Sequence, residues 1–181
     1  MIRALLLIAA LTPASLSVRD VDGRSWSLFA PSAGRFDLLF FISADCPISN
    51  RYAPEIQRVC SDYQSRGVRC FAVYPDATDV AAVKRHRNEY GFGTSIPAIL
   101  DRDRTIVRLA RPHVTPEAAL VSSAGPLYRG RIDDLYVDVG RSRRAPTRRD
   151  LRLALDAAIA GRPIPRAETD AVGCAIQGQR R

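Results

Sequence analysis

Lysine is almost absent from this chain. Lys84 is the only lysine, so 26 of the 27 basic residues are arginines, and the net charge is +8 with a pI near 9.9. Such a basic chain invites a nucleic-acid interpretation. However, the densest basic run, RSRRAPTRRD at 141–150, holds no aromatic residue on which a base could stack. We interpret it as a solvated loop that leads into a helix, and we expect no nucleic-acid partner.

Long hydrophobic runs are missing as well. No apolar stretch approaches the ~20 residues that span a bilayer, so we expect no stable membrane insertion of the mature chain. The run from Ala4 to Leu11 follows Arg3 and precedes the small residues Ala14 and Ser15, as in a short secretory signal. We therefore interpret residues 1–14 as a signal peptide and expect an extracytoplasmic protein, periplasmic or secreted. A misassigned start or a first strand are the alternatives.

Cofactor motifs are also lacking. The chain has no phosphate-binding loop, dinucleotide fingerprint or serine-hydrolase elbow. Its two histidines and four cysteines show no metal-ligand spacing. We therefore expect neither a cofactor nor a bound metal. The 181 residues, 46% apolar and 25% charged, suit one globular domain with a sizeable core.

Apolar patterns predict a mixed α/β protein. FDLLFFIS at 36–43 and VRCFAVYP at 68–75 are nearly continuous apolar runs, typical of strands buried on both faces. Between them, apolar residues recur at helical spacing from Tyr52 to Tyr63. The other patterns predict a strand pair at 16–30, a strand at 96–101, a hairpin at 115–133, and helices at 78–90, 104–110 and 147–161. Strands that alternate with helices favour parallel pairing, and the late hairpin adds antiparallel edges.

Cys46 lies in SADCPIS, where a buried strand ends and a helix begins. Open α/β sheets bind ligands beyond the carboxyl ends of their strands. A helix N-terminus offers free N–H groups and a positive dipole end. Both features favour a thiolate, so we expect Cys46 to be more acidic than a free cysteine. Pro47 suits the first helical turn, while Arg51 would stabilise the anion and Asp45 would oppose it.

The chain resembles the thioredoxin superfamily. The resemblance rests on the order of elements, on the Cys-Pro step after a buried strand, and on Pro54. It also rests on IPAILDRDRTIVRLARPHVTPEAALVSSAGPLYRGRID at 96–133, which is similar to TlpA-like and peroxiredoxin-like (AhpC/TSA, redoxin) domains. The similar part covers roughly residues 17 to 162.

This resemblance implies an α/β fold, a thioredoxin-like three-layer sandwich with a mixed central sheet flanked by helices. We assign the domain to residues 15–162 and a C-terminal tail to 163–181. The resemblance also implies a cis Thr115–Pro116 bond beside the reactive cysteine, where the family offers backbone hydrogen bonds to a bound thiol or peptide. We therefore expect a substrate site formed by Ser43, Pro47, Ser49, Arg51, Thr115 and Pro116.

The chain departs from the family around Cys46. A CxxC oxidoreductase would carry its second cysteine where Ser49 stands, and a CxxxC copper chaperone would carry it where Asn50 stands. Peroxiredoxins have threonine three residues before the cysteine and proline seven before, where this chain has Ser43 and Leu39. Ser43 favours a peroxide substrate, whereas Leu39 and the TlpA-like second half favour a disulfide. Both substrates stay open.

Cys174, in AVGCAI, is the candidate for a second redox cysteine. The segment after Arg162 could reach ~40 Å if extended, so Cys174 could return to Cys46 as a resolving thiol. A free or structural tail cysteine is the alternative. Cys60 and Cys70 fall in a predicted helix and a buried strand, where cysteine packs as a small apolar residue. A disulfide between those two is the alternative there.

Three further titratable residues complete the prediction. We expect His86, in the polar stretch KRHRNE, at the surface, His113 near the rim of the site, and Glu117 as a polar group at an edge. The chain is then a thiol-based oxidoreductase in which Cys46 exchanges disulfides with a thiol or disulfide protein partner, or reduces peroxide as an antioxidant. An external reductant regenerates it. A non-catalytic binding module, or a metal-handling protein with Cys46 and Cys174 as ligands, are the alternatives.

Overall fold

The computed structural model describes residues 15–29, 32 and 34–177, and the proposed signal peptide at 1–14 lies outside them. The central sheet consists of β3 (Phe36–Phe41), β4 (Val68–Tyr74), β5 (Ala98–Leu100), β7 (Glu117–Ser122) and β8 (Gly125–Gly130). Their order is β5-β4-β3-β7-β8. The β3–β4 and β4–β5 pairs are parallel, while β3–β7 and β7–β8 are antiparallel. The predicted mixed sheet is therefore confirmed.

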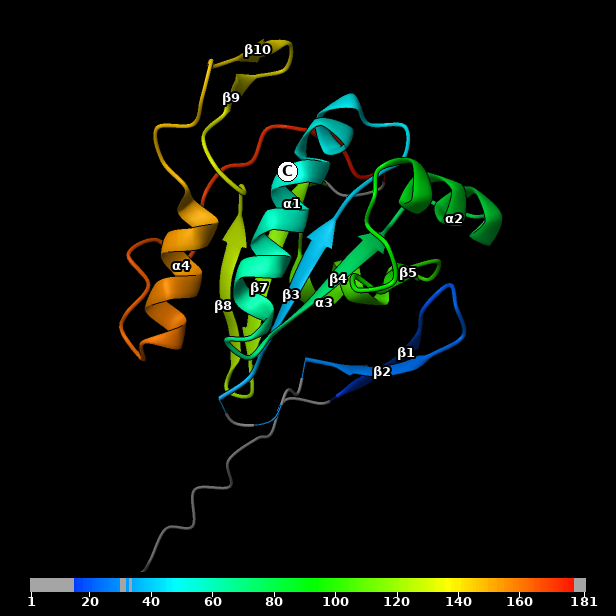
Figure 1. The fold of residues 1–181 in the computed structure, drawn as a ribbon, viewed down its shortest axis with the longest axis horizontal. Helices are drawn as coiled ribbons and strands as arrows, with labels where there is room; N and C mark the ends of the chain where they lie inside the picture. The colour runs from blue at the N-terminus through cyan, green and yellow to red at the C-terminus, as the bar shows by residue number, and fades with distance from the viewer. Residues whose placement is uncertain (1–14, 30–31, 33, 178–181) are drawn as a thin grey trace, which may run out of the picture.

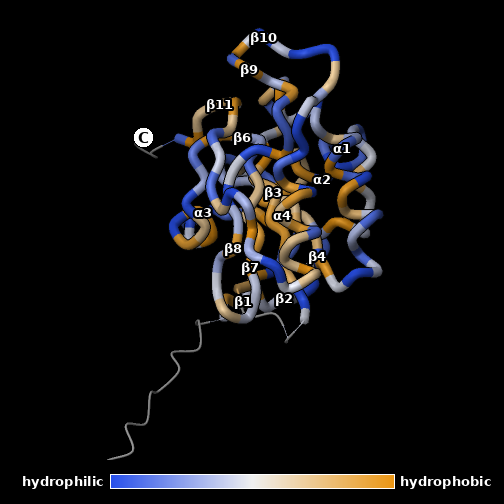
Figure 2. Tube along the Cα trace, turned by 90° about the vertical axis from the view of Figure 1, so that its left-hand side faces the viewer, coloured by the Kyte–Doolittle hydropathy of each residue, from blue (hydrophilic) through white to orange (hydrophobic). Residues whose placement is uncertain are grey.

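Helices cover both faces of this sheet. The helices α1 (Pro47–Gln64), α2 (Val80–Glu89) and α4 (Asp150–Ile159) contribute to one apolar cluster. The helix α3 (Thr105–Ala110) contributes to a second cluster, together with the hairpin of β1 (Leu16–Arg19) and β2 (Ser25–Leu28). Figure 1 shows α1 and α4 in front of the sheet, and Figure 2 places α1 and α3 on opposite sides of the strands. The layers are those that the sequence predicts.

The central strand β3 is apolar from Leu38 to Phe41, and its one charged residue, Asp37, is buried and paired with Arg69. Leu38 and Phe40 enter the cluster under α1, whereas Leu39 and Phe41 enter the cluster on the α3 side. Successive side chains of a strand point to opposite faces, so a strand covered on both faces is apolar at nearly every position. Packing on both faces fixes the position of β3. It therefore also fixes where the loop to Cys46 begins, at the carboxyl end of the strand.

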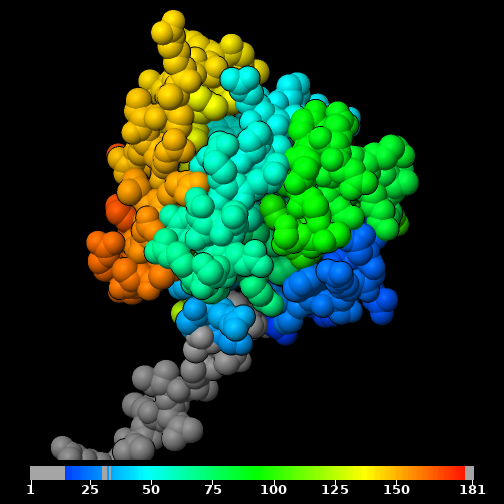
Figure 3. Space-filling view, in the orientation of Figure 1, coloured from blue at the N-terminus to red at the C-terminus, as the bar shows by residue number. Residues whose placement is uncertain are grey.

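Four short strands were not predicted as separate elements, although Thr115, in the first of them, is also the first residue of the predicted hairpin. They are β6 (Val114–Thr115), β9 (Tyr136–Asp138), β10 (Arg141–Ser142) and β11 (Cys174–Ala175). The β9–β10 pair projects beyond the start of α1, as the yellow and cyan regions of Figure 3 show.

The C-terminal tail is bound to the body of the protein. It first runs beside β8, where the Arg129 amide donates to the Ala167 carbonyl at 2.8 Å and the Thr169 amide donates to the Arg129 carbonyl at 3.1 Å. It then returns as β11, which pairs antiparallel with β6. In Figure 1 the red segment crosses behind α1, beyond the tips of the β3 and β8 arrows. The tail thus reaches the edge of the sheet where Cys46 lies.

Candidate redox site

Cys46 stands at the junction of the β3 loop and α1. It is the N-cap residue of α1, has extended backbone geometry, and is followed by Pro47 at the start of the helix. Its amide donates to the Ser43 carbonyl at 3.3 Å, which closes a tight turn before the helix. The side chain is only 1% exposed. Cys46 therefore lies where the positive end of the helix dipole acts on it.

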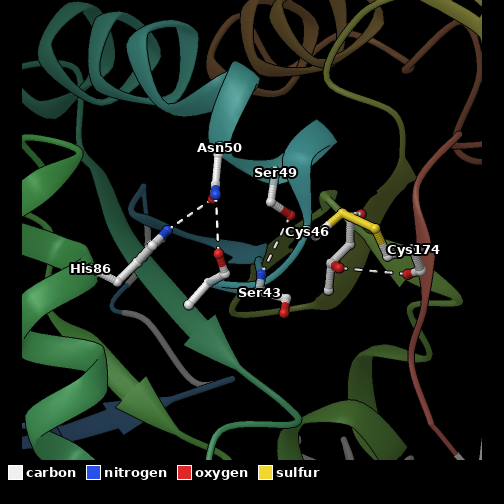
Figure 4. Close-up of a disulfide and its surroundings, with 8 residues drawn as sticks. Ser43, Cys46, Ser49, Asn50, His86 and Cys174 are labelled. Carbon is white, nitrogen blue, oxygen red and sulfur yellow. Dashed lines mark hydrogen bonds between the residues drawn. A yellow bond between two sulfur atoms is a disulfide. The ribbon is translucent and has the colours of Figure 1, made fainter. Parts of the chain in front are cut away.

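Cys174 forms a disulfide with Cys46, and the two Cα atoms are 6.0 Å apart. This separation is ordinary for a disulfide. Figure 4 shows the bond joining the N-terminal end of α1 to the tail. The sequence left open whether Cys174 pairs with Cys46, and the structure joins them across 128 residues of sequence.

Thr115 connects the two cysteines. The Thr115–Pro116 bond is cis, as predicted, and the Thr115 carbonyl oxygen lies 3.1 Å from Cys46 Sγ. Thr115 is also the β-partner of Cys174, and its Oγ1 donates to the Cys174 carbonyl at 3.5 Å. The Thr115 carbonyl is thus placed to accept a hydrogen bond from the Cys46 thiol when the disulfide is reduced.

The tail comes unusually close to the backbone beside Pro116. A Cβ built on Gly173 would collide with the Thr115 carbonyl group. Past the disulfide, the Ile176 amide donates to the His113 carbonyl at 3.2 Å, and the Ile176 side chain is 1% exposed. Glycine before the cysteine and an apolar residue after it therefore allow this segment to lie as a strand along β6. His113 lies beside the docked tail, near the site as expected.

Ser49 and Asn50 hold the loop that carries Cys46. Ser49 Oγ accepts from the Ser43 amide at 3.3 Å, and Asn50 Nδ2 donates to the Ala44 carbonyl at 3.0 Å. These are the positions at which CxxC and CxxxC proteins place a second cysteine. In this chain both side chains turn back to the loop (Figure 4), so they position Cys46 and leave its bonding partner to the tail.

His86 is buried, so the prediction that it lies at the surface is wrong. It is 5% exposed and stands on α2 beneath the loop. Its Nε2 lies 2.9 Å from Asn50 Oδ1, and its Nδ1 lies 2.9 Å from the Tyr74 hydroxyl. Because Asn50 uses its amide group on Ala44, its oxygen must accept, so His86 Nε2 carries the proton and Tyr74 donates to Nδ1. Burial lowers the pKa of His86, although Glu89 and Asp45 oppose this. The neutral ring suits the chain of hydrogen bonds.

Glu117 is likewise not at an edge. It begins β7, which lies between β3 and β8, and it is 2% exposed. Its Oε2 accepts from the amides of His113 at 2.7 Å and Val114 at 3.2 Å. Burial raises the pKa of Glu117, while these two amides oppose the shift. The carboxyl group fastens the segment before the cis bond, a role that the sequence reading missed.

The remaining predicted residues lie around the site with less contact to it. Pro47 and Arg51 are exposed on the first turns of α1, and Ser43 is half-buried. Cys60 and Cys70 are free and buried, which agrees with the packing role expected of them. Over the described ranges, no group of three or more metal-ligating side chains occurs. Nor does any helix described there have the length and hydropathy of a membrane span.

Comparisons with known proteins agree with this geometry. The model of the AhpC/TSA family matches residues 11–119. No curated protein matches the chain by sequence. An uncharacterized conserved protein from Geobacillus kaustophilus is similar in structure, with a TM-score of 0.78, 22% identity, and coverage of 94% of this chain and 92% of that chain. For a hypothetical protein from Sinorhizobium meliloti, the TM-score is 0.76, the identity 22%, and the coverage 94% of both chains.

A third similar structure has a stated activity. It is a secreted disulfide oxidoreductase from Mycobacterium tuberculosis, homologous to E. coli DsbE, with a TM-score of 0.50, 19% identity, and coverage of 61% of this chain and 78% of that chain. These likenesses show a thioredoxin-like fold, and family and neighbours indicate oxidoreductase activity in general. The chain therefore belongs to the AhpC/TSA family, and it has a thioredoxin-like fold.

Proposed function

We propose that the protein is an extracytoplasmic thiol–disulfide oxidoreductase in which Cys46 attacks the substrate and Cys174 resolves the intermediate. The observation that carries this proposal is the Cys46–Cys174 bond, formed by a tail strand that lies on β6 beside the cis bond. A structural tail disulfide would not need to occupy the N-terminus of α1. The assigned leader at 1–14 and the secreted M. tuberculosis neighbour support the location.

The reaction begins from the dithiol form. The Cys46 thiolate attacks one sulfur of a partner disulfide, and the departing partner sulfur takes the electron pair and then a proton. A mixed disulfide with Cys46 results. The Cys174 thiolate next attacks Cys46 Sγ and releases the second partner sulfur as a thiolate, which is protonated in turn. Two electrons and two protons thus pass to the partner, and an external thiol reductant restores the two cysteines.

The docked tail determines when a partner can bind. In the disulfide form, β11 occupies the edge of β6 at Val114 and Thr115. An extended peptide of the partner would use those same backbone groups, because this edge of β6 lies beside Cys46 and becomes free when the tail leaves. Reduction frees the tail from its covalent anchor, so the partner and the tail then compete for one edge. The partner segment would resemble the tail: a cysteine with a small residue before it.

Peroxide is the second candidate substrate. Membership of the AhpC/TSA family and the hydroxyl of Ser43 near the Cys46 turn favour it. Against it, peroxiredoxins have a proline seven residues before the cysteine. This chain has Leu39 at that position, and Leu39 is fully buried inside β3. The same two cysteines would serve: Cys46 would form a sulfenic acid and Cys174 would displace water from it.

A competition between substrates tests the proposal. Reduced protein is mixed with a disulfide-bonded peptide or with hydrogen peroxide, and formation of the Cys46–Cys174 bond is followed by rapid quenching and mass spectrometry. We expect the peptide to react much faster than with a model thiol, and Cys60→Ser to behave as the wild type. Faster reaction with peroxide would assign the peroxidase activity instead. If Cys46 reacts with neither substrate faster than a model thiol does, the non-catalytic binding module is the remaining interpretation.

A further inference from the structure

Cys60 and Cys70 are the two cysteines that the redox site does not use. Cys60 is 6% exposed, Cys70 is 7% exposed, and both thiols are free. Cys60 lies about four turns along α1 from Cys46, a distance of about 20 Å at the rise of an α-helix. The Cys46–Cys174 pair and the Cys60–Cys70 pair therefore lie near opposite ends of α1. They are too far apart for direct thiol–disulfide exchange.

Cys60 and Cys70 both lie in the layer between α1 and β4. Cys70 belongs to the β4 face that joins the cluster under α1, whereas the adjacent Phe71 joins the cluster on the other face. Cys60 lies in the buried stripe of α1 that packs on the same side of the sheet. Only the turn at 65–67 separates the end of α1 from β4. Burial raises the pKa of the Cys60 thiol, and the neighbouring Cys70 thiol raises it further.

Both cysteines line one pocket of about 320 Å³. The exposed residues Gln64, Thr94 and Ser95 share this lining, so the pocket communicates with solvent. A water molecule occupies about 30 Å³ in the liquid, and a hydroperoxide group is little larger. The pocket therefore admits a small oxidant to two thiols that the disulfide of a folded protein could not reach.

We propose that Cys60 and Cys70 form a second dithiol, which a small peroxide oxidises to a disulfide independently of Cys46. One of the two thiols attacks a peroxide oxygen, gives up its proton and becomes a sulfenic acid, and the other peroxide oxygen leaves with that proton as water. The other sulfur then attacks the sulfenic sulfur, closes the S–S bond and releases a second water. The two thiols lose two electrons and two protons, and one hydrogen peroxide becomes two waters.

The test uses the full chain with Cys46 and Cys174 both replaced by serine. The reduced protein is treated with hydrogen peroxide, the remaining thiols are alkylated, and the protein is digested with trypsin. Cys60 and Cys70 fall on separate tryptic peptides, 59–66 and 70–84. We expect these peptides to be joined by a reducible bond, in a monomer that is about 2 Da lighter. The matched chain that also carries Cys70→Ser should show neither change.

Two results would overturn the proposal. One is that both thiols remain alkylatable after peroxide treatment, and the other is that each is oxidised separately to a sulfinic acid. If the double serine variant does not fold, the wild-type chain with its Cys46–Cys174 bond already formed gives the same measurement, because Cys60 and Cys70 are then its two remaining thiols.

Discussion

Thr115 and Cys174 are antiparallel β-partners, and Cys46 touches both: its sulfur is bonded to Cys174 and lies 3.1 Å from the Thr115 carbonyl oxygen. The segment before the cis bond thus serves two purposes. It aligns Cys174 with Cys46, and its carbonyl oxygen contacts Cys46 Sγ in the disulfide form. Breaking this alignment should affect disulfide formation more than folding.

Gly173→Ala tests the alignment directly. The added methyl group would meet the Thr115 carbonyl group, and such overpacking costs about 1–3 kcal/mol. We expect the equilibrium constant for closing the Cys46–Cys174 bond to fall about tenfold or more, measured by titration with a thiol redox buffer. Ala175→Ser, at an exposed position of the same strand, is the control and should stay near the wild-type value. Equal constants for the two variants would mean that the tail reaches Cys46 without this close approach.

Asn50→Ala removes the link between the loop and α2. It leaves the Ala44 carbonyl and His86 Nε2 without their partner, and an unsatisfied buried polar group costs about 1–3 kcal/mol. We expect the free energy of unfolding of the disulfide form, measured in urea, to fall by that amount. Arg51→Ala, the exposed neighbour, should change it by less than about 0.5 kcal/mol. Similar losses in both variants would contradict the role given to Asn50.

His86→Gln tests whether His86 is neutral in the folded chain, through the pH dependence of the free energy of unfolding. Burial holds the pKa of His86 below its usual 6.5 in the folded chain, so the unfolded chain binds a proton first as the pH falls. The stabilising effect of neutral His86 is therefore complete above pH 6.5 and declines as the pH drops toward the lower folded value. We expect the stability difference between wild type and variant to shrink from pH 7.5 to pH 5, measured by urea unfolding. The buried carboxyl groups are common to both chains and cancel. A constant difference would show that His86 does not titrate as the buried ring requires.

The sheet, the main helices and the position of Cys46 could be predicted from the sequence, because they depend on local periodicity and on a proline after the cysteine. It misplaces His86 because the flanking residues of KRHRNE are charged. The three-residue step from Val83 to His86, along the buried side of α2, was the available signal. The strand at Cys174 could not be predicted, since two residues carry no periodicity. Its pairing with Thr115 depends on a contact made far away in the sequence.

Trapping the intermediate in Cys174→Ser tests the central claim most directly. The reduced variant is mixed with a disulfide-bonded peptide, and the tryptic peptides are analysed without reduction. The account predicts a stable mixed disulfide between the peptide and Cys46, on the fragment 36–51, which the wild-type chain resolves to the Cys46–Cys174 bond. Absence of any adduct at Cys46, or an adduct that is released as fast as in the wild type, would contradict the claim that Cys46 attacks and Cys174 resolves.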